Sequence, residues 1–265
     1  MSVERILFVN QEITPYVESS YMSVIGRYLP QSIQEKGIDI RTFMPRYGTI
    51  NERRNQLHEV IRLSGQNIII NDNDHMLIIK VASIQSIRMQ TYFIDNEEFF
   101  RRKALLSDKT EKFFSDNDER AIFYARGVIE TVKNLGWNPD IIHCHGWISC
   151  LVPLFVKEIF KDNPLFANSK VVYSVYNDPF EKILRSLPSK LKSCGILPKV
   201  ASSYKQATYE STTKLAIDYS DAVIISQDDV DEKICSYIAE SNKPHFRHIE
   251  EQYGEEYTSL YNSIV

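Results

Sequence analysis

The fold of this 265-residue chain is decided near its amino terminus, by ILFVNQEITPY at residues 6–16 and GRYLPQSIQEKGIDIRTFMPRYG at residues 26–48. Residues 5–9 form a short run without polar alternation, which is typical of a strand buried on both faces of a parallel sheet. Apolar residues then recur at helical spacing over residues 22–33, and residues 39–43 supply a second apolar run. Strand, helix and strand in this order favour a right-handed parallel crossover.

The rest of the chain continues the alternation of strands and helices. A polar turn separates two apolar runs and predicts a β-hairpin, with strands at 68–70 and 76–81. Further strands are predicted at 91–94, 140–143, 170–176 and, as the last, 222–226, and helices at 118–135, 151–160 and 204–219. This order predicts an α/β fold with a doubly wound, mostly parallel sheet in a single Rossmann-like domain that carries a β-hairpin insertion.

Two later segments have distinct patterns. Residues 179–203 are the least patterned and contain Pro188, Gly195 and Pro198, so we expect a loop with one or two helical turns. Near the carboxyl terminus, apolar and tyrosine side chains fall on one helical face at positions 253, 257, 260, 261 and 264. This spacing predicts an amphipathic helix that docks on the domain.

Composition excludes several classes of function. The net charge is -4 and the basic residues are scattered, so nucleic acid is not an expected partner. The longest apolar runs are far shorter than the roughly 20 residues of a membrane helix, so no membrane association is expected. The amino terminus, MSVERILFV, begins a strand at once and does not resemble a secretory signal. We therefore expect a cytoplasmic protein.

The cysteines and histidines give no sign of a metal or cofactor. The four cysteines lack CxxC spacing and are interpreted as reduced thiols. His143 and His145 flank Cys144, but alternate residues of a strand point to opposite faces, so the three side chains cannot converge on one ion without a turn. No metal and no cofactor are predicted.

Ligands of open α/β sheets bind beyond the carboxyl ends of the strands. The loops that follow the predicted strands should therefore line one rim, and they carry a polar and aromatic mixture that suits carbohydrate: Asp95, His145, Trp147, Tyr176 and Asn177. The alternative is that these are ordinary polar residues at strand ends, with Trp147 as an anchor in the core. No catalytic residue is assigned among them.

The first of these loops carries four more candidate ligand contacts, Tyr16, Glu18, Ser19 and Ser20. It contains no glycine, whereas phosphate binding at a helix amino terminus usually needs one, and Glu18 adds a negative charge. Acids and serines at a helix start also satisfy its dipole and its open N–H groups. The loop therefore disfavours an anionic ligand.

The quoted stretches resemble the opening of bacterial glycogen synthases and plant starch synthases, which form glycosyltransferase family 5. The resemblance continues at five later places: YFIDNEEFF (92–100), DNDERAIFYARG (116–127), DIIHCHGW (140–147), YSVYN (173–177) and YSDAVIISQ (219–227). It implies the GT-B type of fold, in which two Rossmann-like domains enclose the active cleft and the second supplies most of the ADP-glucose site. On this basis residues 1–246 correspond to the first domain, residues 247–265 correspond to a helix that returns to it, and the second domain is missing.

Most departures from the family pattern fall at chemically active positions. The KTGG element of the family is replaced by residues 18–21 (ESSY), the Asp of its HDW element by Gly146, and the His of its TVHN element by Tyr176. A phenol, with a pKa of roughly 10, is a poor substitute for an imidazole in proton transfer. His145 still matches the His of HDW.

Three hypotheses follow. The first is a non-catalytic relative that binds α-glucan or a partner protein. The second is a glucosyltransferase that moves glucose from a sugar nucleotide such as ADP-glucose to an α-1,4-glucan, with its donor half supplied elsewhere. The third is a small-molecule binding module unrelated to glucan. We also expect the face left by the missing domain to be a site of homo-oligomerisation.

Overall fold

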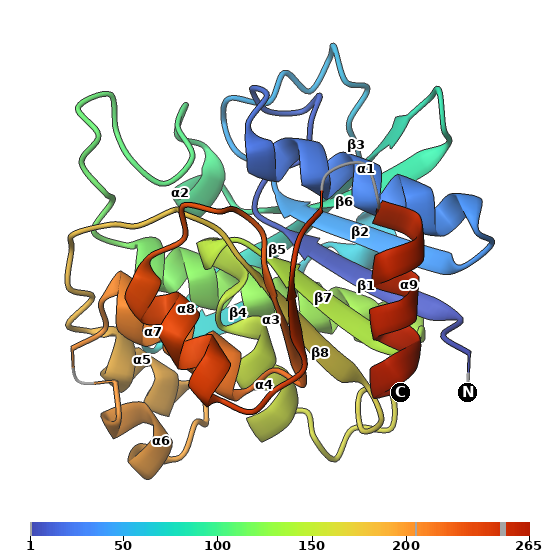
Figure 1. Ribbon diagram of the computed structural model, residues 1–265. Coiled ribbons are helices and arrows are strands. Elements are labelled where there is room, and N and C mark those ends of the chain that lie inside the picture. Colours follow the sequence, from blue (N-terminus) through green and yellow to red (C-terminus); the bar gives the residue numbers. More distant parts are fainter. Residues whose placement is uncertain (1, 205, 250–252) are drawn as a thin grey trace.

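The computed structural model describes residues 2–204, 206–249 and 253–265. These residues form a sheet in the order β10-β9-β8-β7-β1-β2-β6-β5-β3, with β4 paired to β5 (Figure 1). The strands are β1 (Arg5–Asn10), β2 (Asp39–Pro45), β3 (His58–Glu59), β4 (Gln66–Ile70), β5 (Asn73–Ile84), β6 (Met89–Asp95), β7 (Ile141–His145), β8 (Lys170–Val175), β9 (Ala222–Ile225) and β10 (His245–Arg247).

The helices alternate with the strands as a doubly wound fold requires. They are α1 (Tyr21–Glu35), α2 (Glu97–Phe100), α3 (Asn117–Leu135), α4 (Val152–Glu158), α5 (Leu187–Ser193), α6 (Pro198–Ser202), α7 (Tyr209–Asp218), α8 (Glu232–Glu240) and α9 (Tyr253–Ile264). Two short 3₁₀ turns occur at Ile61–Leu63 and Trp147–Ser149. In Figure 1, α9 lies beside α1 in front of the sheet and α3 passes behind it.

The strands from β10 to β6 are parallel, and only the β3–β5 segment pairs antiparallel. The carboxyl ends of the parallel strands therefore meet at one edge of the sheet, which we call the rim. The central strands β1 and β7 are almost entirely buried, as expected for strands covered on both faces. The predicted α/β class, the hairpin insertion and the returning helix α9 are confirmed.

Two expectations need correction. Strand β9 is not the last, because α8 follows it and β10 extends the sheet in parallel beyond it. β10 has only three residues, of which Phe246 alone is apolar, so it gives no periodic signal. Helix α7 begins at Tyr209 and not at 204, because the Thr208 side chain caps it there. Residue 205 of that predicted helix, and residues 250–252 of the predicted returning segment, lie outside the described residues.

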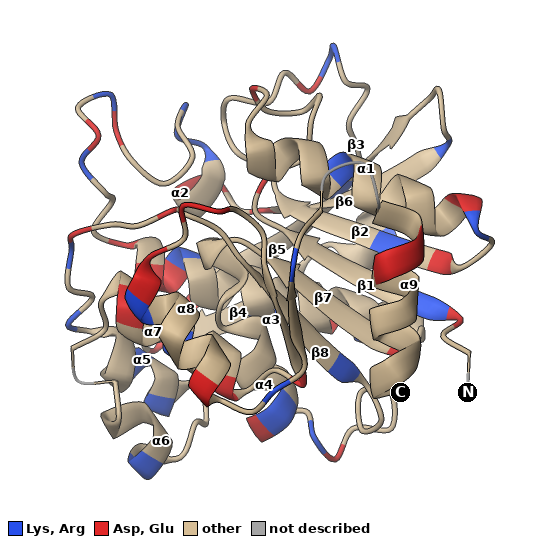
Figure 2. Ribbon diagram, viewed as in Figure 1, with Lys and Arg blue, Asp and Glu red and all other residues tan. Residues whose placement is uncertain are grey.

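Charged side chains and thiols are distributed over several elements of the described structure. Figure 2 shows lysine and arginine spread over many elements. The four cysteines are free thiols, of which Cys144, Cys150 and Cys194 are buried and Cys235 is half-buried. In the described part of the chain, no group of three or more His, Cys, Asp or Glu side chains could hold a metal ion. No helix there has both the length and the apolarity to cross a membrane.

Candidate functional site

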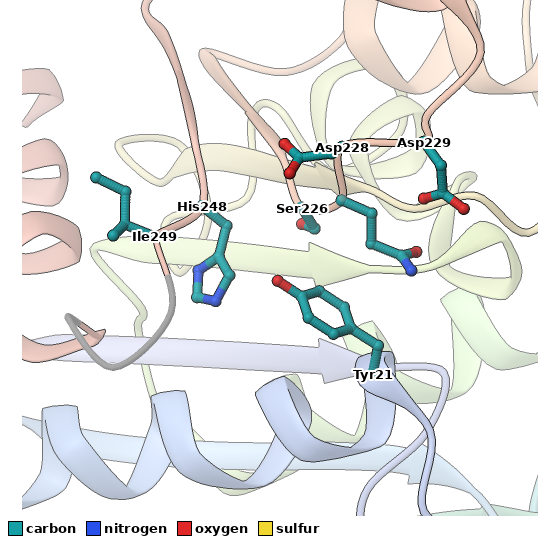
Figure 3. A pocket seen from close by; sticks show the side chains of 7 residues that line it. Tyr21, Ser226, Asp228, Asp229, His248 and Ile249 are labelled. Carbon is teal, nitrogen blue, oxygen red and sulfur yellow. The ribbon is translucent and has the colours of Figure 1, made fainter.

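Two cavities open along the rim. The first-loop cavity, of about 620 Å³, lies between the loop after β1 and the segments around positions 49–54 and 105; its lining is Glu12, Pro15, Tyr16, Val17, Glu18, Ser19, Ser20, Thr49, Arg54 and Leu105. The Tyr21 cavity, of about 420 Å³, lies at the end of β9; its lining is Tyr21, Ser226, Gln227, Asp228, Asp229, His248 and Ile249 (Figure 3). Each cavity has a lining residue at the start of α1, which is Ser20 for the first-loop cavity and Tyr21 for the other.

The first loop is held by the cap of α1. The Ser20 hydroxyl accepts the N–H of Ser23, the Ser23 hydroxyl accepts the N–H of Ser20, and the Ser20 hydroxyl also donates to Glu12. This capping box satisfies N–H groups at the helix start that a bound phosphate would otherwise take. Ser20 therefore has the structural role that its position in the sequence indicated.

The first-loop cavity has a mixed polar and apolar lining that includes two carboxylates. Glu12 and Glu18 face it together with the hydroxyls of Ser19 and Thr49, and Arg54 is the one basic residue of its lining. Tyr16 is only 5% exposed, and its ring packs edge-on against Phe93 with the ring centroids 4.9 Å apart. Tyr16 thus forms the floor of the cavity, while Glu18, Ser19 and Thr49 line it from exposed positions.

The Tyr21 cavity has a different character. The described residues of its lining include no lysine or arginine. The phenol of Tyr21 extends across the cavity toward His248 (Figure 3), with the two ring centroids 6.1 Å apart. The Nδ1 of His248 lies 2.8 Å from the hydroxyl of Tyr257 in α9. Burial lowers the pKa of His248 to about 4, so this imidazole is neutral at pH 7. Asp228 and Asp229 lie on this wall, and the guanidinium of Arg247 lies 3.6 Å from Oδ1 of Asp228.

The histidine retained from the family pattern lies beneath the rim and not on it. His145 is 0% exposed, and its Nδ1 is 2.9 Å from the hydroxyl of Tyr176. Burial lowers the pKa of His145 to about 3, and burial raises the pKa of Tyr176. Neither group exchanges protons readily near pH 7 in this setting.

Trp147 is an anchor of the core. It is 1% exposed, its indole N–H donates to the hydroxyl of Thr212 at 2.8 Å, and its main-chain N–H donates to Asp178 at 2.8 Å. Gly146 before it has a φ of +79°, and a Cβ there would lie 2.7 Å from Sδ of Met22. This backbone fits glycine and would be strained by the Asp of the family motif.

Two predicted site residues remain: Asp95 lies outside both cavities, and Asn177 lies beside the Tyr21 cavity. Asp95 is 2% exposed and pairs with Nε of Arg46 and Nζ of Lys80, each at 3.0 Å, outside both cavities. Asn177 is exposed, and its amide donates to Asp229 at 2.8 Å, which fixes the wall of the Tyr21 cavity. The structure therefore brings Tyr16, Glu18, Ser19 and Ser20 together, and it buries His145, Trp147 and Tyr176.

Three residues near the cavities were not singled out from the sequence. Burial raises the pKa of Asp178 to about 7, and its only sequence signal is that it follows Asn177 in a loop of the rim. Tyr21 carried a signal, because it stands where the family has a glycine. His248 had none, because the strand that places it was not predicted.

The fold defines an α/β protein with cavities at the carboxyl edge of a parallel sheet, which is where open α/β sheets bind their ligands. A family model that describes the starch synthase catalytic domain matches residues 5–245. The chain belongs to this family, glycosyltransferase family 5.

Relatives and solved structures agree with this assignment. The chain is 38% identical over 196 residues to a glycogen synthase of Chlorobium limicola, a match that covers 71% of this chain and 40% of that protein. It is 40% identical over 174 residues to a glycogen synthase of Chlorobaculum tepidum, covering 65% of this chain and 36% of that protein. The chain thus spans about two-fifths of the length of these relatives.

Among solved structures, the catalytic domain of starch synthase IV from Arabidopsis thaliana, bound to ADP and acarbose, superposes with a TM-score of 0.74 at 17% identity. The match covers 94% of this chain and 52% of that one, and at this identity it supports the fold alone.

Proposed function

We propose that this chain is a cytoplasmic, glycogen synthase-like domain that binds α-glucan in the first-loop cavity and does not transfer glucose by itself. The proposal depends on a contrast between two places. The first-loop cavity is lined by exposed carboxylate and hydroxyl side chains, whereas His145 and Tyr176, at positions where the family resemblance would place site residues, are buried. A partner protein that covers the rim, including a second copy of the chain, is compatible with this role.

The lining of the first-loop cavity supports binding of a neutral sugar. Carboxylates such as Glu12 and Glu18 accept hydrogen bonds from hydroxyl groups, and Ser19 and Thr49 both donate and accept. Its volume of about 620 Å³ is in the range of small-molecule sites. The negative charge of Glu18 opposes an anionic ligand but not a polyol.

The buried groups support the lack of transfer activity. Glucosyl transfer from a sugar nucleotide needs cationic groups that stabilise the leaving diphosphate. Glu18 has the opposite charge, Arg54 is the one basic residue among the described lining of the first-loop cavity, and the described lining of the Tyr21 cavity has none. His145 has a pKa of about 3 and is fully enclosed. Proton transfer by a group with such a pKa is inefficient near pH 7.

Affinity electrophoresis in native gels that contain glycogen tests the binding. We expect the protein to be retarded by glycogen, and we expect Thr49→Trp, which fills the first-loop cavity from an exposed position, to abolish the retardation. Ser189→Trp on α5, also exposed and outside both cavities, is the matched control and should be retarded like the wild type. Equal migration in gels with and without glycogen would contradict the proposal.

Incubation with labelled ADP-glucose and glycogen tests the transfer. No label should enter the polysaccharide. Incorporation that Thr49→Trp abolishes would refute the non-catalytic part of the proposal.

The second candidate is a glucosyltransferase whose donor half is supplied elsewhere. It is favoured by the 38% identity to a protein named glycogen synthase. The same incubation distinguishes it, repeated after addition of a separately produced second domain of that glycogen synthase. Incorporation only when both parts are present would support this candidate over the first.

A further inference from the structure

Strand β4 is an edge strand that lacks the usual protection of sheet edges. Its strand partner among the described residues is β5 alone, and its sequence, QNIII over Gln66–Ile70, contains no charge and no proline. Exposed edges in natural sheets are normally blunted by lysine, proline, a bulge or a very short length, because unpaired N–H and C=O groups there accept another strand.

The other ends of the sheet show this protection. β10 has three residues, and Lys243 and Arg247 carry charge at or beside it. β3 has two residues. Of the described edge strands β3, β4 and β10, only β4 has as many as five residues and no charged residue.

The register shows which backbone groups face outward. Ile70 pairs with Asn73 across a two-residue turn, so Ile70, Ile68 and Gln66 direct their N–H and C=O groups toward β5. The alternate residues, Asn67 and Ile69, direct theirs away from β5. Neither has a hydrogen bond to a described residue outside the β4–β5 ladder.

Apolar side chains accompany these backbone groups. Ile69 is 58% exposed and Met76 of β5 is 54% exposed, and the register sets them diagonally on the outer face of the hairpin. On the inner face, Ile68 and Ile70 are at most 2% exposed, and the hairpin packs against α3. The edge is therefore held in an extended shape before any partner arrives.

We propose that β4 pairs antiparallel with β4 of a second copy of this chain, about a two-fold axis through Ile68. In this register Asn67 of one copy faces Ile69 of the other, so each such pair exchanges two N–H···O bonds between the outward groups. The pairing is isologous, and a strand without charge meets itself without repulsion. A second copy is thereby favoured over a charged partner, for which β4 has no complementary group.

Sedimentation velocity over a hundredfold range of concentration tests the proposal on the full chain. We expect a monomer–dimer equilibrium for the wild type. Ile69→Lys should raise the dissociation constant about tenfold or more, because it places like charges across the axis. Ile69→Pro removes an outward N–H without removing a bond to β5, so it should have the same effect.

Leu197→Lys is the matched control, because Leu197 is 60% exposed and precedes α6, away from the hairpin. It should leave the dissociation constant unchanged. Circular dichroism checks that each variant is folded. A wild type that stays monomeric throughout the range, or a dimer that Ile69→Lys leaves intact, would overturn the proposal. All three variants should be retarded by glycogen like the wild type. The experiment can therefore contradict the dimer proposal without contradicting the glucan proposal.

Discussion

Three histidine–tyrosine pairs connect the elements beneath the rim. His143 lies 2.7 Å from the hydroxyl of Tyr261, His145 lies 2.9 Å from that of Tyr176, and His248 lies 2.8 Å from that of Tyr257. Two of these tyrosines belong to α9, so the pairs join the last helix to the centre of the sheet and to the segment after β10. A buried imidazole nitrogen without a partner is costly, which makes each hydroxyl important for stability.

Tyr261→Phe removes the hydroxyl that partners Nδ1 of His143. We expect it to lower the free energy of unfolding by about 1–3 kcal/mol, because the nitrogen stays buried without a hydrogen bond. Urea denaturation followed by circular dichroism measures the change. Tyr28→Phe on α1, where the side chain is 42% exposed, is the control and should be near neutral. Equal losses in both variants would argue against the role of the pair.

For individual residues, the sequence predicted which face of a strand a side chain occupies better than how deeply the side chain is buried. Alternation in β7 correctly places His143 and His145 on one face, where their ring centroids are 3.9 Å apart. It could not show that Tyr176 and α9 bury these rings, because those residues come from 31 or more positions later in the chain. The same limit applies to Trp147, for which the sequence is consistent with both a rim position and a core position.

Helix α1 is stabilised at its amino terminus by the N-cap residue Ser20. Ser20→Ala removes the capping box at the start of α1 and should lower the free energy of unfolding by about 1 kcal/mol. Thermal unfolding followed by far-ultraviolet circular dichroism measures it. Ser19→Ala, at an exposed position with no side-chain cap, serves as the control and should change little. An unchanged midpoint of thermal unfolding for Ser20→Ala would contradict the role of the Ser20 side chain in stabilising α1.

Most elements were predictable from local pattern, whereas strand β10 depends on long-range pairing. β1, α1, β2 and the hairpin have clear apolar periods, whereas β10 exists because His245, Phe246 and Arg247 pair in parallel with β9. The Tyr21 cavity could not be predicted for the same reason, since His248 reaches it from the end of β10. Helix α8 was missed although it has a local signal, because Asp231 caps it and the buried Ile234 and Ile238 are four residues apart.

The whole molecule should lose stability in acid. The pKa of His145 is about 3 in the folded protein against about 6.5 in the unfolded chain, so the unfolded chain binds more protons between these values. The free energy of unfolding therefore falls as the pH falls below 6.5, by about 2 kcal/mol at pH 5 from His145 alone. Burial lowers the pKa of His143 and His248 in the same direction.

Asp178 opposes this trend. Its folded pKa of about 7 lies above that of an unfolded aspartate, so the folded protein binds the extra proton and gains stability as the pH falls from 7. The Asp178→Asn variant should therefore lose stability more steeply than the wild type between pH 7 and pH 5. Urea titrations at several pH values measure both slopes. A shallower slope for the variant would contradict the assigned direction for Asp178.

The placement of the thiols gives a chemical measure of how the molecule opens. Cys144 lies in the middle of the sheet, Cys150 follows the turn after β7, and Cys194 follows α5; all three are buried, and burial raises their thiol pKa. With a disulfide reagent at neutral pH we expect Cys235, which is half-buried, to react first and the other three only when their surroundings unfold. Rapid reaction of more than one thiol would contradict this order. With the same reagent, single-cysteine variants would then report separately on opening of the sheet centre and of the α5 region.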